Sequence, residues 1–329
     1  MGESPVPDAG QVTLPSSAYY CLLDEQPTHL VPQRLLADAN GGAGSSPLMV
    51  DPRCFFAHRR EVPSELADRA DLFENFAPGE IVWVRDPATE MSTPFWLGPE
   101  FISLLQNAEP GYPEPCGLPN RARSILMNAG ILVEQDYASR RRKEWMEIVL
   151  QCRRAFEKGY VPIGCLIHPF HVAALRRYYR CLIRTGRVRL GDNQSPIRYV
   201  AHNESVARFF HHQLTTVVTD IVGEPVKPSY VYLSTYLAGA ELEKHTDRPQ
   251  CEFSITLCLD HSPEPVRETP WPLYLETNYG LVTVYQALGD ALLYRGRELP
   301  HYRHPLPHGR TSTSIFFHYV RADFNGSLS

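Results

Sequence analysis

The chain changes its sequence pattern at Gly223, and this change limits the folds that are open to it. Before this point, apolar residues recur in three segments every three or four positions, which is the spacing of one face of a helix. After it, short runs rich in β-branched and aromatic residues alternate with turn signals such as Gly289-Asp290. Helices followed by a run of short strands predict an α+β fold in which a β-sandwich or barrel comes last.

These patterns also predict where the elements lie. Apolar residues at helical spacing predict helices over residues 138–156, 169–185 and 205–222. Strands are predicted over residues 231–236, 254–259, 273–276, 281–285, 291–294 and 314–320. We expect the β part to hold the functional site.

The region before the first long helix divides into two parts. Residues 1–75 are rich in Pro, Gly, Ser and Ala and predict an irregular N-terminal segment, with a flexible loop at 39–46. Residues 76–137 predict a small accessory α+β unit. Its expected order is a strand over 81–84, helices over 101–105 and 119–129, and a strand over 131–133.

That order of elements resembles the winged-helix-like, peptide-binding domains found beside peptide-modifying enzymes. We therefore expect residues 1–137 to form a separable unit that assists substrate capture. Residues 138–329 would form the third part, made of helices and the β structure that carries the chemistry.

Composition excludes several classes of function. A net charge of −5 argues against a general nucleic-acid binder, and no apolar run is long enough to span a bilayer. The N-terminus lacks the pattern of a secretory signal, and Val6 interrupts a myristoylation motif. The eight cysteines form no CxxC pair. We expect a cytoplasmic protein with reduced thiols and no nucleic-acid or membrane partner, and the sequence leaves its oligomeric state open.

His245-Thr-Asp247 is the first motif with chemical meaning. In an extended segment, residues two apart point to the same side, so both side chains can face one metal ion. Imidazole and carboxylate ligands together suit a borderline metal such as iron(II). The HxD pattern is short, however, and occurs often by chance.

A second group of residues strengthens this interpretation. Gly289-Asp-Ala-Leu-Leu-Tyr294 predicts a turn and a strand, and His301 follows seven residues later. Arg310 comes nine residues after His301, and Ser312 shares its side of an extended segment. These two side chains could bind one carboxylate, with the guanidinium contacting it bidentately.

The order of HxD, GDA-strand, His and Arg-x-Ser resembles that of the iron(II)- and 2-oxoglutarate-dependent oxygenases, in their prolyl-hydroxylase-like and phytanoyl-hydroxylase-like branches. The resemblance covers residues 156–320. It implies a double-stranded β-helix, or jelly roll, that is flanked by helices and holds iron(II) at one mouth. It also implies that 2-oxoglutarate and O2 are co-substrates, converted to succinate and carbon dioxide while the substrate is oxidised.

The resemblance also selects among neighbouring residues. His301 is the expected third ligand, because His304 lies only six residues before Arg310 and precedes Pro305, which favours a turn. His308 lies closer still to Arg310, in a predicted turn.

Other residues keep two interpretations. Tyr232 and Tyr236 could hydrogen-bond the far carboxylate of 2-oxoglutarate or could be core tyrosines. Arg248 could face the substrate or could be a solvated charge. Asp290 is expected to be a turn residue. Halogenating relatives carry Gly or Ala at the position of Asp247, so the resemblance favours hydroxylation.

The leading hypothesis is therefore a hydroxylase that acts on an unactivated C–H bond of an amino acid, a peptidyl residue or a small natural product. The long N-terminal region favours a peptide or protein substrate. One alternative is a non-catalytic barrel that binds a metal or an acidic ligand. Another is a zinc hydrolase with the same three ligands, although no Glu stands in an obvious general-base position.

Overall fold

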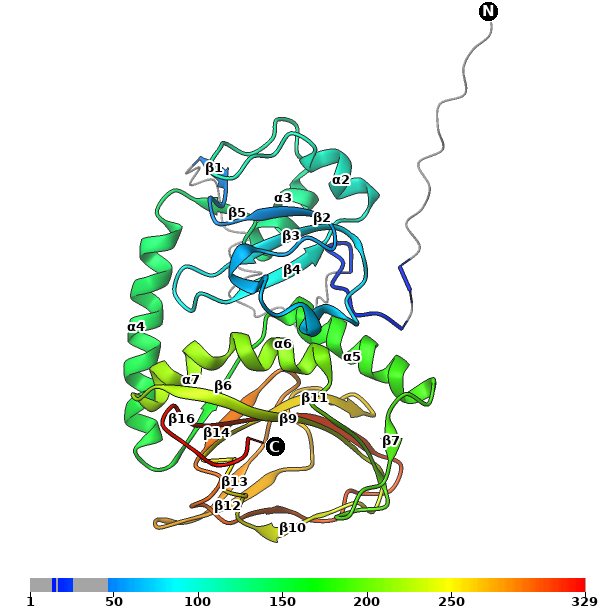
Figure 1. The fold of residues 1–329 in the computed structure, drawn as a ribbon, viewed down its shortest axis with the longest axis vertical. Helices are drawn as coiled ribbons and strands as arrows, with labels where there is room; N and C mark the ends of the chain where they lie inside the picture. Colours follow the sequence, from blue (N-terminus) through cyan, green and yellow to red (C-terminus); the bar gives the residue numbers. More distant parts are fainter. Residues whose placement is uncertain (1–13, 16, 26–46, 329) are drawn as a thin grey trace, which may run out of the picture.

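The computed structural model of the protein describes residues 14–15, 17–25 and 47–328. The flexible loop predicted at 39–46 lies outside these residues. Figure 1 shows an N-terminal part and a larger C-terminal part, with helices between them. Within the described residues, no helix is long and apolar enough to cross a membrane.

The N-terminal part contains two small antiparallel sheets and short helices. Its elements are β1 (Leu48–Val50), β2 (Phe55–Arg59), η1 (Ser64–Leu66), η2 (Ala70–Phe73), β3 (Gly79–Arg85), β4 (Ser92–Trp96), α2 (Pro99–Leu105), α3 (Asn120–Asn128) and β5 (Leu132–Glu134). One sheet has the order β2-β3-β4, and the other pairs β1 with β5. The four elements predicted between residues 81 and 133 are all present as β3, α2, α3 and β5.

The structure does not confirm two predictions about this region. Residues 48–75 are not irregular, because they include β1 and β2, and the accessory unit therefore begins before residue 76. The winged-helix-like arrangement is not observed either, because β3 and β5 lie in different sheets. The short β1 and β2 have little pattern of their own. They exist because β5 and β3 supply their hydrogen-bond partners, which are distant in the sequence.

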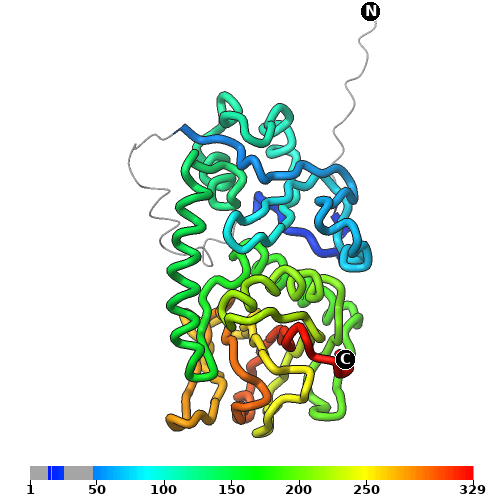
Figure 2. Tube along the Cα trace, turned by 60° about the vertical axis from the view of Figure 1, so that its left-hand side comes forward, coloured from blue at the N-terminus to red at the C-terminus, as the bar shows by residue number. Residues whose placement is uncertain are grey.

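Four helices connect the two parts. They are α4 (Tyr137–Phe156), α5 (Pro169–Arg184), α6 (Ser205–Gln213) and α7 (Thr215–Val222). The first two match their predictions, whereas the single helix predicted over 205–222 is interrupted at Leu214. Helices α5, α6 and α7 lie between the N-terminal sheet and the large β-sheet (Figure 1), and α4 runs along the side of both parts (Figure 2).

The change of pattern at Gly223 marks a helix end. Gly223 follows α7 with a φ of 85°, a left-handed conformation that a residue without a side chain adopts at little cost. The chain then enters the β part, which is where the sequence predicts the strands to begin.

The C-terminal part consists of two facing antiparallel sheets. The large sheet has the order β6-β14-β11-β16-β9-β8-β7 and the small sheet β10-β15-β12-β13. The large sheet contains β6 (Tyr160–Ile163), β7 (Arg189–Leu190), β8 (Arg198–His202), β9 (Val226–Tyr236), β11 (Phe253–Ser262), β14 (Ala291–Tyr294) and β16 (Thr311–Arg321). The small sheet contains β10 (Leu242–His245), β12 (Leu273–Thr277), β13 (Gly280–Val284) and β15 (His301–Arg303).

From β9 onward the chain passes repeatedly between the two sheets, and this topology is consistent with the predicted jelly roll. All six predicted strands are present. The short strands β10 and β15, which carry candidate metal ligands, were not predicted as strands. They are only four and three residues long, so their sequences show too little alternation to be recognised.

One apolar core joins the two parts of the protein. The partly buried ring of Phe73 and the buried ring of Phe76 in the N-terminal part pack against Phe209 of α6, with ring centroids 5.8 and 5.3 Å apart. The hydroxyl of the buried Tyr19 lies 2.6 Å from Nδ1 of His171 in α5. The helices thus have apolar contacts on both sides, against the N-terminal part and against the large sheet.

The shared core leads us to expect that the C-terminal part does not fold alone. A chain that begins at Ala138 would expose Phe209 and Phe210, both fully buried in the whole protein. We expect it to be insoluble, or to lack a cooperative unfolding transition. In the full chain, Phe209→Ala should lower the free energy of unfolding by about 3–5 kcal/mol, and the control Leu281→Ala, at an exposed position, by less than about 0.5 kcal/mol. A soluble fragment from 138 that unfolds cooperatively would instead support the separable unit predicted from the sequence.

Candidate metal centre

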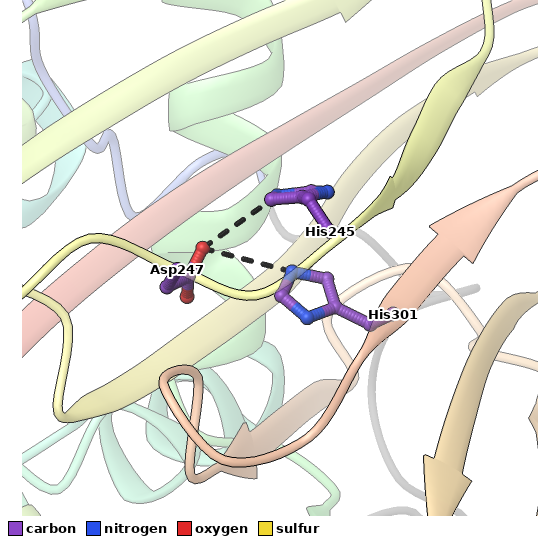
Figure 3. Close-up of side chains that lie close together, drawn as sticks. All are labelled: His245, Asp247 and His301. Carbon is purple, nitrogen blue, oxygen red and sulfur yellow. Dashed lines mark ion pairs between the residues drawn. The ribbon is translucent and has the colours of Figure 1, made fainter.

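Three candidate ligands meet where β10 and β15 pair. His245 ends β10 and stands opposite His301, the first residue of β15, in the antiparallel register. Asp247 follows two residues after His245, and its Oδ1 lies 3.7 Å from Nε2 of each histidine. Figure 3 shows the carboxylate facing both imidazole rings. The structure therefore brings together the three residues that the sequence proposes as ligands.

The hydrogen bonds of the two histidines leave the same nitrogen available on each ring. Nδ1 of His245 lies 2.7 Å from the carbonyl oxygen of Glu243, and Nδ1 of His301 lies 2.9 Å from that of Leu299. A carbonyl only accepts, so each Nδ1 carries the proton and each Nε2 keeps a lone pair. Burial also lowers the pKa of His301, which favours the neutral form that binds metals.

The spacing of the ligand atoms fits one ion. One donor atom from each of the three residues lies within 4.8 Å of the other two. Bonds of about 2.1 Å that meet at right angles would place ligand atoms about 3.0 Å apart, so small side-chain movements would close the site on an ion. Two imidazoles and one carboxylate on one side leave further coordination positions open.

A chain of hydrogen bonds holds the second oxygen of Asp247. The hydroxyl of Ser254 donates to Oδ2 of Asp247 at 2.7 Å, and Nδ1 of His318 lies 2.9 Å from the same hydroxyl. The single hydroxyl proton is already used, so His318 must donate. Asp247 can therefore direct Oδ1 toward the histidines while Oδ2 is fixed.

Gly296 completes the support of this carboxylate. Its carbonyl accepts a 2.9 Å hydrogen bond from the Asp247 amide. A Cβ atom at Gly296 would lie 2.1 Å from Oδ2 of Asp247 and 2.7 Å from the Ser254 hydroxyl oxygen. The close approach of the backbone to the carboxylate thus requires glycine at this position.

The two histidines that were alternatives to His301 as third ligand lie outside the cluster of candidate ligands. His304 is exposed beside the rings of Tyr274 and Tyr302, and His308 is exposed in the following turn. Neither belongs to the ligand cluster. Asp290 accepts a 2.9 Å hydrogen bond from the Ala287 amide through its own side chain, as expected of a turn residue.

The cluster opens into a cavity of about 960 Å³, which we call the mouth cavity. It is lined by the three candidate ligands and by aromatic and polar residues that include His202, Tyr230, Tyr232, Arg248, Phe316 and His318. Arg248 is exposed at this opening, in a position suited to the predicted substrate contact. A cavity of this size holds a ligand larger than 2-oxoglutarate.

Two tyrosines of β9 have partners that the sequence did not suggest. The Tyr232 hydroxyl donates to Asp192 at 2.6 Å, and the carboxylate of Asp192 also binds Arg198. Tyr236 is fully buried against Trp271, with ring centroids 5.0 Å apart. Tyr232 therefore builds the wall of the mouth cavity, and the pKa of Asp192 is lowered to about 2 by its hydrogen-bond partners despite burial.

Arg310 lies beside His261, at the far end of β11. Nη1 of Arg310 lies 3.4 Å from Nε2 of His261, and Ser312 is buried opposite His261 in the strand register. Burial lowers the pKa of His261, and the positive charges of Arg310 and Arg303 lower it further. Arg310 and Ser312, the predicted carboxylate clamp, thus lie next to His261, which the sequence analysis missed.

Arg303 is buried without an acidic partner among the described residues. Only 5% of its surface is exposed, and its guanidinium donates to the Trp271 carbonyl and to Gln286 Oε1, and also faces the Trp271 ring. Burial lowers its pKa. A buried cation with only neutral partners favours a bound anion, because the anion would offset its desolvation.

Uncommitted hydroxyl groups lie on the same inner surface. Ser234 stands between Tyr232 and Tyr236 on β9, and Thr256 faces Phe316 across the strands. Alternation along a strand turns both side chains toward the barrel interior. Both hydroxyls are buried, and neither has a hydrogen-bond partner in the structure. The interior is therefore suited to a polar ligand.

Sequence reasoning missed the residues that support the three ligands. Arg303 had a usable signal, because it follows His301 by two residues in an extended segment. Ser254, Gly296 and His318 had none, since they come from separate parts of the chain. Tyr294, whose hydroxyl lies 3.4 Å from Nε2 of His301, was noted only as the end of a strand.

The comparisons with known proteins give structural likenesses alone. No family model and no curated protein matches the chain. A solved structure of the α-ketoglutarate-dependent epimerase SnoN from nogalamycin biosynthesis shares 13% identity over 54% of this chain and 84% of its own, with a TM-score of 0.45. A Pseudomonas putida prolyl-4-hydroxylase shares 16% identity over 53% of this chain and 99% of its own, with a TM-score of 0.44.

HygX from Streptomyces hygroscopicus, solved with nickel, 2-oxoglutarate and hygromycin B, shares 15% identity over 53% of this chain and 88% of its own, with a TM-score of 0.42. A further similar structure is described as an oxidoreductase of the 2OG-Fe(II) oxygenase family from Burkholderia pseudomallei, with 14% identity over 55% of this chain and 92% of its own and a TM-score of 0.43. At such low identity and TM-score, these likenesses do not assign a family or a function to the chain.

We expect substitutions of the three candidate ligands to weaken iron(II) binding, and substitutions of the neighbouring histidines to leave it unchanged. His245→Ala, Asp247→Ala and His301→Ala each remove one of three protein ligands and should weaken iron(II) binding by more than about 100-fold. His304→Ala and His308→Ala should leave it unchanged. Anaerobic titration with iron(II), followed by calorimetry, measures these affinities. Loss of binding in His304→Ala with retention in His301→Ala would reverse the ligand assignment.

The support of Asp247 yields a second expectation. Ser254→Ala frees one carboxylate oxygen and should weaken iron(II) binding about 10–100-fold. Gly296→Ala should be more damaging, because the new methyl group would overlap the carboxylate. Gly164→Ala is the matched control, since its nearest non-neighbouring atom would be 3.8 Å away. Unchanged affinity in Gly296→Ala, with the fold intact by circular dichroism, would contradict this role.

Proposed function

We propose that the protein is a non-haem iron(II), 2-oxoglutarate-dependent oxygenase that hydroxylates a C–H bond of its substrate. The observation that carries this proposal is the cluster of His245, Asp247 and His301 at the mouth of a barrel whose interior holds Arg303, a buried cation with no acidic partner among the residues that the structure describes. A metal site beside a site for an anion is what a metal and a 2-oxo acid together require. A barrel that binds only a metal has no need of the second site.

Each residue of the centre has a defined task in this proposal. His245 and His301 present Nε2 to the metal, and Asp247 adds one negative charge through Oδ1. Ser254 and His318 fix the other oxygen of that carboxylate. Iron(II) and 2-oxoglutarate, when bound, supply the oxidation of a C–H bond by O2, coupled to decarboxylation of the 2-oxo acid to succinate and carbon dioxide.

The far carboxylate of 2-oxoglutarate would lie near His261, between Arg303 and Arg310. Arg303 has no acidic partner among the described side chains, and Arg310 is only partly buried, so both can contribute positive charge there. Ser312 is buried on the adjacent strand and can add a hydroxyl donor. The unpartnered hydroxyls of Ser234 and Thr256 favour a polar molecule along the interior.

The substrate would enter through the mouth cavity. Its volume of about 960 Å³ admits an amino acid, a peptide segment or a small natural product. Tyr230 and His318 form an aromatic wall there, with ring centroids 4.6 Å apart, and the exposed Arg248 stands at the rim. This wall can orient a substrate above the metal ligands.

An experiment on the co-substrate tests this function. Anaerobic iron(II) and 2-oxoglutarate should give a weak visible charge-transfer band, and O2 should then produce succinate. Arg303→Met and Arg310→Ala should each raise the half-saturating 2-oxoglutarate concentration about 100-fold, because each removes a positive charge from the carboxylate site. Ser312→Ala, which removes one hydrogen bond, should raise it about 10-fold.

Iron(II) binding without co-substrate serves as the control and should not change in these variants, since none of the three residues is a ligand. Metal binding with neither the band nor succinate would refute the oxygenase and favour a barrel that binds a metal alone or a zinc hydrolase. If both arginine variants keep the half-saturating 2-oxoglutarate concentration of the unmodified protein, the co-substrate does not bind between these two arginines.

A further inference from the structure

A second cavity lies in the N-terminal part, on one face of the three-stranded sheet. Its volume is about 410 Å³. Phe55 pairs with Trp83 across β2 and β3, and Arg85 pairs with Ser92 across β3 and β4. Paired residues point to the same face, as do residues two apart, so these four side chains share one surface. Arg53 and the segment 62–65 form the rest of the wall. We call this the sheet pocket.

The sheet pocket has more hydrogen-bond donors than acceptors to receive them. Three of its lining residues carry a buried donor atom with no partner in the structure: Nη1 of Arg53, Nε of Arg85 and Nε1 of Trp83. Trp83 is only 2% exposed, so water does not readily replace the missing acceptor. Unsatisfied buried donors are uncommon in native proteins and call for an explanation.

The two arginines are already held by acids. Nε and Nη2 of Arg53 donate to the buried Asp51 at 2.9 and 2.7 Å. Nη2 of Arg85 lies 2.6 Å from Glu90, and its Nη1 lies 3.7 Å from Glu65. These carboxylates fix the guanidinium groups in place and leave one surplus donor on each.

The charges decide which acceptor fits. Two arginines face the three carboxylates of Asp51, Glu65 and Glu90, so the local charge is already slightly negative. A further anion would be repelled, whereas neutral carbonyl oxygens would satisfy the donors without adding charge. The remaining walls are apolar, because they come from Phe55, Val62 and Pro63. Phe55 is 39% exposed and available for contact.

We propose that the sheet pocket binds a peptide segment. Its backbone carbonyl oxygens accept from the surplus donors of Trp83, Arg53 and Arg85, and one aliphatic side chain packs against Phe55 and Pro63. The three donor atoms are buried in the free protein, so small side-chain rotations on binding bring them within reach of the ligand. If the protein is the oxygenase proposed above, this pocket gives a peptide substrate a second anchoring point apart from the metal, and such two-point binding raises the total affinity.

The indole N–H signals of the full-length protein provide the test. The chain has four tryptophans. The indole N–H groups of Trp96, Trp145 and Trp271 already donate to Ala77, Asp220 and His304. In ¹⁵N-labelled protein, titration with N-acetyl-leucinamide should move the Trp83 signal downfield and saturate in the millimolar range expected for so small a ligand. The other three signals serve as internal references, and Trp83→Phe identifies the responding one.

Comparator ligands and variants make the result decisive. N-acetylglycinamide, which lacks the apolar side chain, should bind several-fold more weakly, and acetate should cause no saturable shift. Phe55→Ala and Arg85→Met should weaken binding at least about fivefold. The exposed controls Leu281→Ala and Arg69→Met should not. A saturable response to acetate in place of the amide, or no response of Trp83 to either, would overturn the proposal.

A metal-site variant separates this inference from the proposed function. His301→Ala should abolish succinate formation but keep the Trp83 response. If the protein forms no succinate under any condition but its Trp83 signal still responds, the peptide site is supported and the proposed oxygenase function is contradicted. If the protein forms succinate but its Trp83 signal does not respond, the oxygenase function is supported and the peptide site is contradicted.

Discussion

The pairing of β10 with β15 is the contact on which the rest of the site depends. It sets His245 opposite His301 in the antiparallel register of the small sheet. A slip of either strand by one residue would turn its histidine to the other face of the sheet, since side chains alternate along a strand. The same alternation along β15 turns Arg303, two residues beyond His301, to the face that carries His301. One pairing therefore positions both the candidate ligands and the buried cation.

The carboxylate of Asp247 is held from outside this pairing. Ser254 and His318 come from two neighbouring strands of the large sheet, and Gly296 comes from the loop before β15. The site thus bridges the two sheets of the barrel. Because the supporting groups leave Oδ1 uncommitted while Oδ2 is bonded, the two oxygens of one side chain have different tasks. Such support is what sets the orientation of a metal ligand.

The N-terminal part has a structural role as well as a candidate binding role. Its aromatic residues pack on α5 and α6, whose other sides pack on the large sheet that carries Ser254 and His318. Only one layer of helices thus separates the N-terminal core from the large sheet. This shared packing is the reason why we expect the two parts to fold together, although the order of elements in the sequence suggests a separate domain.

The sequence by itself determined the elements with strong local patterns and the candidate ligands. The helices near 138–156 and 169–185 and six strands follow from periodicity and turn residues, His245 and Asp247 from their spacing, and His301 from the resemblance in motif order. Only the tertiary structure decided the pairing of β1 with β5, the direction of Tyr232 toward Asp192, and the burial of Arg303 without an acidic partner among the described residues. The physical reason is the same in each case. A helix or a long strand is specified by neighbours in sequence, whereas short strands, hydrogen-bond partners and buried charges depend on groups that only the folded chain brings together.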